Sequence, residues 1–313
     1  MTHFQRKAYK NGNSLLPMKC KKAIVCTPNE RYAEGITPDE VRKKLGKPDY
    51  QKALAQHKAY CDALRQAGVT EIIDLAAYRE EWSRLPCWRD YIPVHFSPDD
   101  CFVEDLAVVT EQGVILTNPG HPQRRGEVFF MDYVLNDCLK YSLIGSIQSP
   151  GYLDGGDVVR VGNHYFLGYS DRETDIRTNT EGLRQLEKIL TEKGYTFSRI
   201  PVRKPLHLST GSSCLDNRTV VTISEFFDYY SNHVARDRIN MLLPARSEEY
   251  ATNMRSVNGH VLMPAGFPSM KMMVRDLDYK LKIIEVELSE FQKQNGSTTC
   301  LSLLVPETLK SSG

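Results

Sequence analysis

The chain has 313 residues, of which 41% are hydrophobic and 25% are charged, fractions that are ordinary for a globular protein. Forty Lys and Arg residues balance thirty-nine Asp and Glu residues, and a formal net charge of +1 argues against nucleic-acid binding, which usually needs a strongly basic domain. No apolar run approaches the roughly 18 residues that span a bilayer, and the start of the chain lacks the apolar stretch of a signal peptide. We therefore expect a soluble, cytoplasmic protein without a membrane or nucleic-acid partner.

The eight cysteines are scattered, at positions 20, 26, 61, 87, 101, 138, 214 and 300, and none forms a Cys-x-x-Cys pair. A disulfide framework is not expected in a chain of this size without a secretion signal, and the ligand spacings of zinc fingers are absent. We expect free thiols in a reducing compartment, no metal, and no sugar at the Asn-x-Ser/Thr matches of Asn217 and Asn295.

One pattern recurs along the chain: a strand-like run, a short turn, a second run, a polar loop and a helix. The paired runs are 102–109 with 114–116, 158–161 with 165–167, a run ending at 217 with 220–223, and 256–257 with 261–263. The last pair flanks Asn258-Gly259, the strongest hairpin signal of the four. The turns recur at roughly 40 to 55 residues, a period typical of blades or arrays.

Two helices are expected, over residues 48–68 and 180–194. The first has Leu54, Cys61 and Leu64 on its inner face, beside His57, which we interpret as a packed histidine rather than a ligand. The second has an apolar stripe at 183, 186, 189 and 190, with a predicted capping box of Thr178 and Glu181 before it.

One repeat of this kind cannot bury its own apolar face, so stacked repeats must share a core. We therefore predict a single α/β domain of blades around an axis over residues 19–306. A loose extension, residues 1–18, precedes it, and a tail, residues 307–313, follows it.

Four carboxylates cluster at Asp99-Asp100 and Glu104-Asp105, before and inside the predicted strand at 102–109. Strand alternation would place Glu104 and Asp105 on opposite faces. Burying a carboxylate is costly without a partner, so a cation is expected nearby, from the protein or from a ligand. A structural salt bridge or a solvated turn is the alternative interpretation.

Arg124, Arg125 and Arg177 are of the residue type that binds carboxylates in a bidentate manner, although each alone is more often a surface residue. Acidic and basic clusters in successive repeats would give one pocket with a negative and a positive end. Such a pocket fits a small zwitterion with a distant cation, for which arginine and its relatives are the obvious candidates.

Three further residues have the right type for catalysis. His207 lies between two leucines near a strand end, where a neutral imidazole can exchange protons, although a satisfied core histidine is the alternative. Asp154 lies in a glycine-bearing turn from which a carboxylate could orient a histidine, a weak signal because Asp-Gly turns are common. Cys300 follows a polar, Gly-containing loop at the start of an apolar strand, which would place its sulfur at a pocket rim.

Seven features occur in a fixed order: LGKPDY at 45–50, FVED at 102–105, LDGGD at 153–157, RTN at 177–179, LHL at 206–208, MPAG at 263–266, and the late Cys300. Together they resemble the dimethylarginine dimethylaminohydrolase family in its bacterial form, from about Lys22 to Leu304. The resemblance implies the fold of the guanidino-group-modifying (pentein) enzymes, a five-bladed ββαβ propeller with pseudo-fivefold symmetry. Four copies of the repeat are visible, so the fifth blade must combine the two chain ends.

By the same resemblance, Cys300 is the nucleophile, His207 is the general acid and base, and Asp154 orients His207. The resemblance also implies a set of substrate-binding residues. They are Asp105, Asp99 and Glu104 for the guanidinium, Arg124 and Arg177 for the carboxylate, and the backbone carbonyl of Ile36 at a lid position for the α-amine.

Two stretches depart from the family pattern. About five extra residues precede the RTN motif, which makes Arg172 a competitor of Arg177 for the substrate carboxylate. The segment between Asp74 and Asp99 is also longer than expected and predicts an enlarged edge loop.

The implied reaction is hydrolysis of an N-omega-methylated arginine to citrulline and a methylamine, through a covalent S-alkylthiouronium on Cys300, without metal or cofactor. Carboxylates near Cys300 should raise its pKa and a bound cation should lower it, so we hypothesise a mostly neutral resting thiol.

Two alternatives stay open. An arginine deiminase, which releases ammonia, has a second acid in a His-x-Asp motif where this chain has Ser209, and that difference favours methylated substrates. The other is a non-catalytic protein that binds arginine derivatives. The expected partner is a small molecule, and the sequence leaves a homodimer open.

Overall fold

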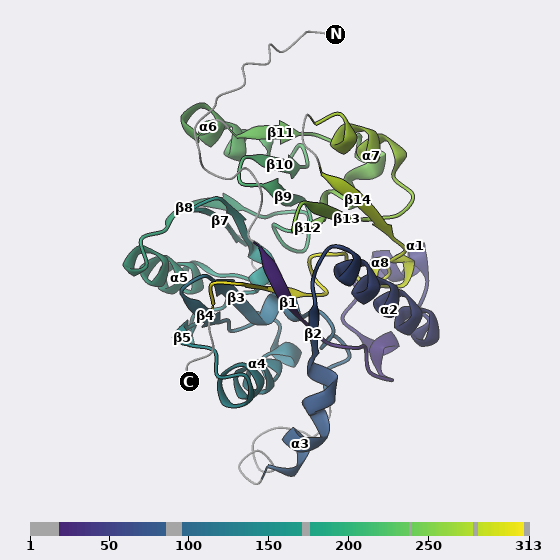
Figure 1. Ribbon diagram of the computed structural model, residues 1–313, viewed down its shortest axis with the longest axis vertical. Helices are drawn as coiled ribbons and strands as arrows, with labels where there is room; N and C mark the ends of the chain where they lie inside the picture. Colours follow the sequence, from purple (N-terminus) through teal and green to yellow (C-terminus); the bar gives the residue numbers. More distant parts are fainter. Residues whose placement is uncertain (1–18, 86–95, 171–175, 238, 278–280, 310–313) are drawn as a thin grey trace.

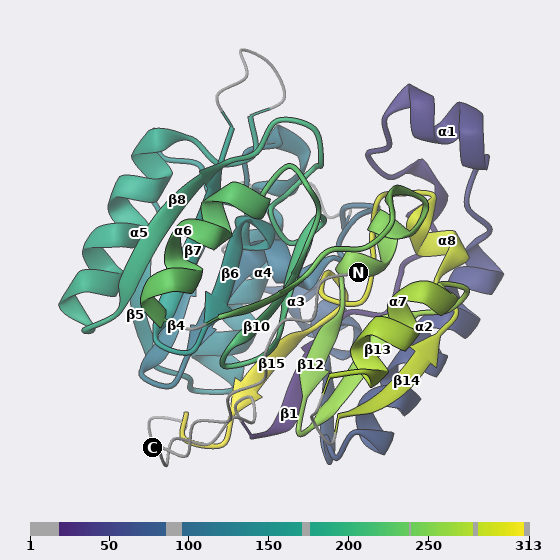
Figure 2. The same ribbon diagram turned by 90° about the horizontal axis from the view of Figure 1, so that it is seen from above.

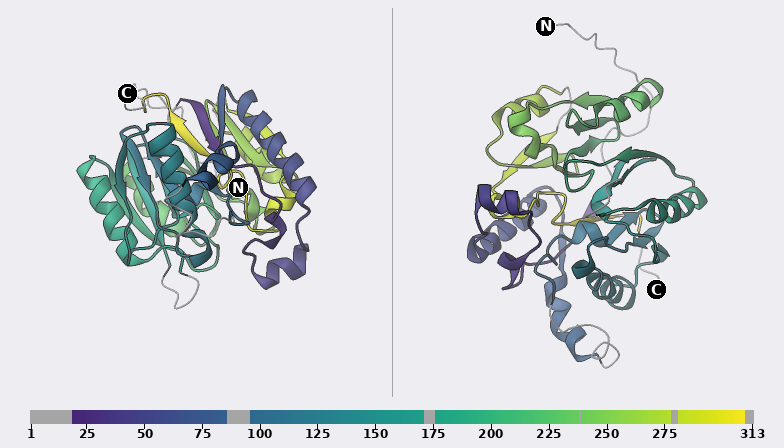
Figure 3. Two further views of the ribbon diagram at one scale, coloured as in Figure 1. Left: turned by 90° about the horizontal axis from the view of Figure 1, so that it is seen from below. Right: turned by 180° about the vertical axis from the view of Figure 1, so that it is seen from behind.

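The structure is a computed structural model that describes residues 19–85, 96–170, 176–237, 239–277 and 281–309. In these ranges the chain forms five three-stranded sheets arranged in a ring, with the longer helices outside the strands (Figure 1, Figure 2). The same arrangement is visible from below and from behind (Figure 3). In each sheet the central strand pairs with one antiparallel and one parallel neighbour, and a helix connects the parallel pair. The predicted single-domain, five-bladed ββαβ propeller is therefore confirmed.

Four blades follow one another along the chain, and their bounds are as follows. The first has β3 (Ala107–Thr110), β4 (Gly113–Leu116), α4 (Glu127–Asp132) and β5 (Leu143–Ser146). The second has β6 (Val158–Val161), β7 (His164–Tyr169), α5 (Thr180–Glu192) and β8 (Thr196–Pro201). The third has β9 (Ser212–Asp216), β10 (Thr219–Thr222), α6 (Phe227–Asp237) and β11 (Asn240–Leu242). The fourth has β12 (Arg255–Val257), β13 (His260–Pro264), α7 (Pro268–Arg275) and β14 (Lys282–Val286).

The fifth blade joins the two ends of the described chain, as the repeat count predicts. It contains β15 (Leu303–Pro306), β1 (Cys20–Val25), α2 (Tyr50–Gln66) and β2 (Glu71–Asp74). Ile24 lies opposite Leu303 in the antiparallel pair and beside Ile73 in the parallel pair. This blade closes the ring, so loops from all five blades can converge on one axis.

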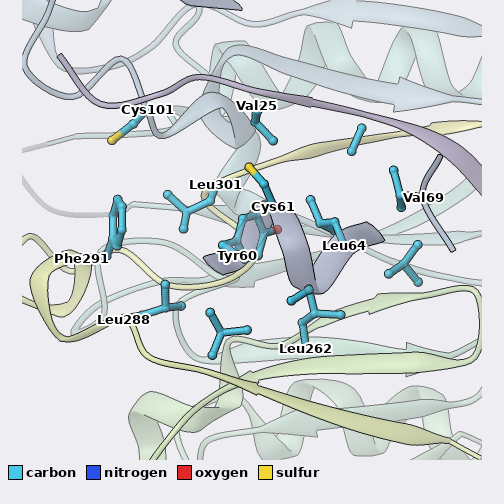
Figure 4. Packing of buried hydrophobic residues seen from close by; sticks show 14 of the residues in the cluster. Val25, Tyr60, Cys61, Leu64, Val69, Cys101, Leu262, Leu288, Phe291 and Leu301 are labelled. Atoms are coloured by element: carbon cyan, nitrogen blue, oxygen red, sulfur yellow. The ribbon is translucent and has the colours of Figure 1, made fainter. Parts of the chain in front are cut away.

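A hydrophobic cluster packs α2 against β1 of its own blade and against the neighbouring blade of β12 to β14 (Figure 4). Tyr60 and Leu64 from α2 are fully buried in it, together with Phe291 from α8 (Ser289–Gln292). His57 is also buried, with its ring centroid 6.5 Å from that of Phe291, so it is a packed histidine as expected. Leu54, in contrast, is only half-buried.

The segment before β3 corrects one prediction. Residues 102–106 do not extend the strand, because Val103–Leu106 form a 3-10 turn and β3 begins at Ala107. The carbonyl oxygens of Phe102 and Asp99 accept hydrogen bonds from the buried guanidinium of Arg124, at 2.9 and 3.4 Å, instead of from a neighbouring strand. The alternation argument for Glu104 and Asp105 was therefore wrong.

The start of α5 corrects a second prediction, the capping box. The capping side chain is Asn179, which accepts from the backbone N–H of Gly182 at 2.8 Å, and no capping box of Thr178 and Glu181 forms. Thr178 is buried and donates instead to Asp157 at 2.6 Å, because that carboxylate needs a donor in the interior.

Several expectations fall outside the described residues: the extension at 1–18, the end of the tail at 310–313, and Cys87. The long segment after Asp74 begins with the 3-10 turn Leu75–Tyr78 and with α3 (Arg79–Arg84), which projects from the ring, while residues 86–95 are outside the description (Figure 1). Helix α1 (Asp39–Leu45) precedes α2. None of the described helices is both long and apolar enough to cross a membrane.

The cluster around α2 predicts how the fold responds to cavity formation. Phe291→Ala removes a fully buried ring that contacts Tyr32 and Phe102, and we expect it to lower the free energy of unfolding by about 3–5 kcal/mol. Met272→Ala is the control, because this side chain is 63% exposed and its truncation should change stability by less than about 0.5 kcal/mol. Urea unfolding measures both, and equal effects would contradict the packing described.

Candidate active site

One pocket collects side chains from loops of different blades. Seven residues predicted from the sequence line it: Ile36, Asp99, Asp105, Arg124, Arg177, His207 and Cys300. Its volume is about 30 Å³, room for no more than a water molecule or two. The other two predicted residues, Asp154 and Glu104, lie behind this lining, where each contacts residues of the site.

Cys300 lies in the loop between α8 and β15. The loop turns at Asn295, whose φ is +58°, and is tied by the backbone N–H of Gly296 to the carbonyl of Phe291 at 2.9 Å. Gly296 is required there, because a Cβ atom would collide with the ring of Phe102. The strand begins only at Leu303, so Cys300 lies in the loop and not at the strand start that the sequence suggested.

His207 lies in the connection between β8 and β9, and it is buried between two carboxylates. Its Nε2 is 2.9 Å from Oδ2 of Asp154, and its Nδ1 is 3.7 Å from Oδ1 of Asp105. Burial alone would lower the pKa of His207, but the charge of Asp105 and the hydrogen bond to Asp154 outweigh it and raise the pKa to about 9. The imidazole is therefore protonated at neutral pH, with the positive charge held between the two acids.

Asp154 has no exposed surface and precedes the 3-10 turn Gly155–Asp157. Its Oδ1 accepts from the backbone N–H of Gly120 at 2.8 Å, which leaves Oδ2 directed at His207. Gly156 in this turn approaches the site closely, since a Cβ atom would lie 2.9 Å from His207 Nδ1 and 2.8 Å from Asp105. A side chain at position 156 would therefore displace His207 or Asp105, and glycine avoids this.

The four clustered carboxylates separate into two kinds. Asp105 and Asp99 line the pocket: Asp105 pairs with Arg124 and accepts from the N–H of Gly156 at 3.1 Å, and Asp99 accepts from the N–H of Ile36 at 3.0 Å. Burial would raise the pKa of Asp105, but His207 and Arg124 lower it overall, so this carboxylate stays ionised.

Asp100 and Glu104 point elsewhere. Asp100 forms an ion pair with Arg79 at 2.7 Å. Glu104 lines a separate cavity of about 790 Å³, where it lies 3.3 Å from Arg255 and accepts from Thr299 and Ser209 at 2.7 and 3.2 Å. The structure therefore does not place Glu104 in the pocket with Asp105.

Arg124 is buried and holds several acceptors at once. Its guanidinium pairs with Glu127 at 2.7 Å and with Asp105. Burial would lower the pKa of Arg124, but these two carboxylates raise it well above its usual value. Burial also raises the pKa of Glu127, to about 7, although Arg124 opposes this rise.

The other arginines differ in position. Arg177 lines the pocket, with Nη1 4.0 Å from Oδ2 of Asp154, while its competitor Arg172 lies outside the described residues. Arg125 stacks over the ring of Tyr152 at 4.3 Å and donates to the carbonyls of Pro119 and Gly120, so it supports the loop.

The thiol of Cys300 lies in an acidic environment. Burial raises its pKa first, and the negative charges of Glu104 and Asp105 raise it further, to about 12. A resting thiol therefore stays neutral unless a further positive charge enters the pocket. This direction agrees with the hypothesis drawn from the sequence.

Asp105, Asp154 and His207 are the one described group with metal-like geometry, since their ligand atoms lie within 4.8 Å of one another. A histidine that binds a metal must be neutral, whereas His207 is held as an imidazolium by these same two carboxylates. In the structure described, the two carboxylates contact both ring nitrogens of His207 and favour its protonated form.

Two residues at the site were not predicted as site residues from the sequence. Asp157 accepts from the N–H of Leu208 at 2.9 Å and from Thr178, which fixes the backbone next to His207. Asn253, just before β12, places its Nδ2 3.8 Å from Sγ of Cys300. These contacts join residues 21 to 51 positions apart, and no local pattern predicts them.

No protein-family model matches the chain. Over 283 residues it is 34% identical to the N(G),N(G)-dimethylarginine dimethylaminohydrolase of Pseudomonas aeruginosa, covering 90% of this chain and 98% of that protein. It is 29% identical over 290 residues to a protein of the same name from Streptomyces coelicolor, covering 93% and 99%. A solved structure of the Pseudomonas aeruginosa protein, a cysteine-to-serine variant with citrulline, matches with a TM-score of 0.75 at 32% identity, covering 91% and 99%. The chain belongs to the dimethylarginine dimethylaminohydrolase family.

Proposed function

We propose that this protein hydrolyses an N-omega-methylated arginine to citrulline and a methylamine through a covalent intermediate on Cys300. The observation that carries the proposal is a half-buried thiol that shares one small pocket with a carboxylate-paired imidazolium. The family supports it, because the relative from Pseudomonas aeruginosa bears this activity in its name and has been solved with citrulline.

The charged groups of the pocket suit the two ends of such a substrate. Asp105 and Asp99 would face the guanidinium, while Arg124 and Arg177 would hold the carboxylate and the carbonyl of Ile36 would meet the α-amine. Glu104 would act on the guanidinium only at longer range, because its side chain is paired with Arg255. A pocket of about 30 Å³ must widen for this ligand, so the lining side chains have to move on binding.

The chemistry follows from the charges. A bound guanidinium lowers the pKa of the Cys300 thiol, its proton leaves to solvent, and the thiolate attacks the guanidinium carbon. As the C–N bond breaks, the His207 imidazolium donates its proton to the departing amine. Neutral His207 then takes a proton from water, whose oxygen attacks the same carbon, and the C–S bond breaks to release citrulline. Asp154 keeps the ring oriented through both steps.

Ser209 bears on the choice of substrate. Its hydroxyl donates to Glu104 at 3.2 Å, so this position offers no free carboxylate to pair with the far guanidine nitrogens. An unmethylated nitrogen would lose a partner there, whereas methyl groups need none. We therefore favour methylated arginine over arginine. An enzyme that acts on a small molecule is also favoured over a nucleic-acid-binding protein, because the net charge is only +1.

The proposal predicts the products and the nucleophile. With asymmetric dimethylarginine the protein should release citrulline and dimethylamine in equal amounts, with kcat/KM at least tenfold higher than for arginine. Cys300→Ser should lower citrulline formation by more than about 10³-fold. Faster turnover of arginine, with ammonia released, would reverse the substrate assignment, and binding of methylarginine without citrulline would restore the non-catalytic alternative.

The acidic environment of Cys300 predicts its reactivity. Without ligand, the rate of Cys300 alkylation by iodoacetamide should rise with pH up to at least pH 9 without a plateau, because the thiol pKa is near 12. An unreactive amidinium ligand that leaves the sulfur accessible should raise the rate at pH 7 by supplying positive charge. Mass spectrometry of the Cys300 peptide measures the alkylation rate at each pH, and a plateau of this rate below neutral pH would show a preformed thiolate.

The pair of Asp154 and His207 predicts a shift of the pH profile. Asp154→Asn removes one of the charges that raise the pKa of His207, so this pKa should fall from about 9 toward 6.5. The alkaline limb of kcat should move to lower pH, and kcat at pH 7 should fall by about 10²-fold. Asp74→Asn changes a carboxylate that accepts from Thr27 and should leave the profile unchanged. An unmoved alkaline limb in Asp154→Asn would contradict the assignment.

A further inference from the structure

Asn253 lies at the meeting point of the two loops that carry Cys300 and His207. It follows the 3-10 segment Arg246–Thr252, precedes β12, and is only 2% exposed. Its Nδ2 is 3.0 Å from the carbonyl of Ser209, 2.9 Å from Oγ1 of Thr299 and 3.8 Å from Sγ of Cys300. One buried amide nitrogen therefore reaches the histidine loop, the cysteine loop and the sulfur itself.

The rest of Asn253 holds the cysteine loop from the other side. Its Oδ1 accepts from the backbone N–H of Thr299 at 2.8 Å, and its backbone carbonyl accepts from the hydroxyls of Thr298 and Ser297 at 2.9 and 3.3 Å. The side chain thus has two separable parts. The oxygen holds the backbone of the cysteine loop, and the nitrogen faces the carbonyl of Ser209, the hydroxyl of Thr299 and the sulfur.

The direction of the nitrogen matters because the two charged groups that act most on the sulfur, Glu104 and Asp105, are carboxylates that raise its pKa. Glu104 and Asp105 face Cys300 from the turn before β3, Tyr250 from the segment before Asn253, and His207 across the pocket. Arg255 is directed to Glu104 and to the carbonyl of Ser302. An N–H donor near the sulfur favours the thiolate over the thiol, opposite to the effect of the carboxylates.

We propose that Asn253 is a positioning residue for Cys300: its amide N–H groups favour the thiolate and hold the sulfur in a fixed position relative to the loop that carries His207. The inference rests on the proposed function only in taking Cys300 as the nucleophile. It assigns a role to a residue that has no ionisable group and no sequence motif.

Asn253→Asp tests the nitrogen separately from the oxygen, because a carboxylate keeps an acceptor for the N–H of Thr299 and replaces the donor by a second oxygen. The rate of Cys300 alkylation at fixed pH should fall at least tenfold, and its pH dependence should move to higher pH. With methylarginine, kcat should fall by about 10²-fold while KM changes less than threefold. Asn253→Ala should show a smaller loss in the same direction, and it carries the test if the Asp variant does not fold.

Asn258→Asp is the matched control at the opposite end of β12. Its amide also donates to one backbone carbonyl and accepts from one backbone N–H, both of Cys20, at 2.7 and 2.9 Å. This variant should keep wild-type alkylation and kcat. A folded Asn253 variant with an unmoved alkylation profile would overturn the proposal, even if kcat and the melting temperature fell together. If Cys300→Ser retained activity, in contrast, the proposed function itself would fail.

Discussion

The site depends on the mutual neutralisation of buried charges. Asp154, His207, Asp105, Arg124 and Glu127 form a continuous line of alternating acids and bases, all of them less than a tenth exposed. An isolated charge at any of these positions would be costly, because protein interiors solvate ions poorly. Each member therefore constrains the position of the next, and the line crosses from the blade of β6 to β8 into that of β3 to β5.

The propeller makes this line possible. Each blade is a short unit that cannot stand alone, and its loops reach the axis only when the ring is closed by β1 and β15. Cys300 and Asn253 precede one strand each in neighbouring blades, and His207 lies in the connection between two others. The closing strand pair thus brings the sulfur and the imidazole to one pocket.

The sequence predicted the repeat and most of the site residues, but not their contacts. The hairpins were predictable because Asn258-Gly259 and similar turns have a local conformational preference. The segment at 102–106 was mispredicted as strand, since the carbonyl of Phe102 accepts from Arg124, about 20 residues later, and no local pattern contains that information. Asn253 was missed for the same reason: its partners Ser209 and Cys300 are distant in sequence and carry no motif that includes it. The family resemblance grouped Glu104 with Asp105, whereas the structure directs Glu104 to Arg255 from a 3-10 turn.

The internal ion pairs also bear on the electrostatic cost of placing a charged ligand in this pocket. Arg124 is paired with Asp105, and Arg177 lies 4.0 Å from Asp154. The pocket therefore already contains contacts between cations and carboxylates, the two kinds of charge that a zwitterionic arginine derivative carries. Binding of the proposed substrate would exchange one set of pairs for another and leave no buried charge alone, which would limit its electrostatic cost. In the proposed reaction the product citrulline would lack the positive charge of the guanidinium, and Asp105 could then pair again with Arg124. The loss of charge that defines the reaction would therefore also favour release of its product.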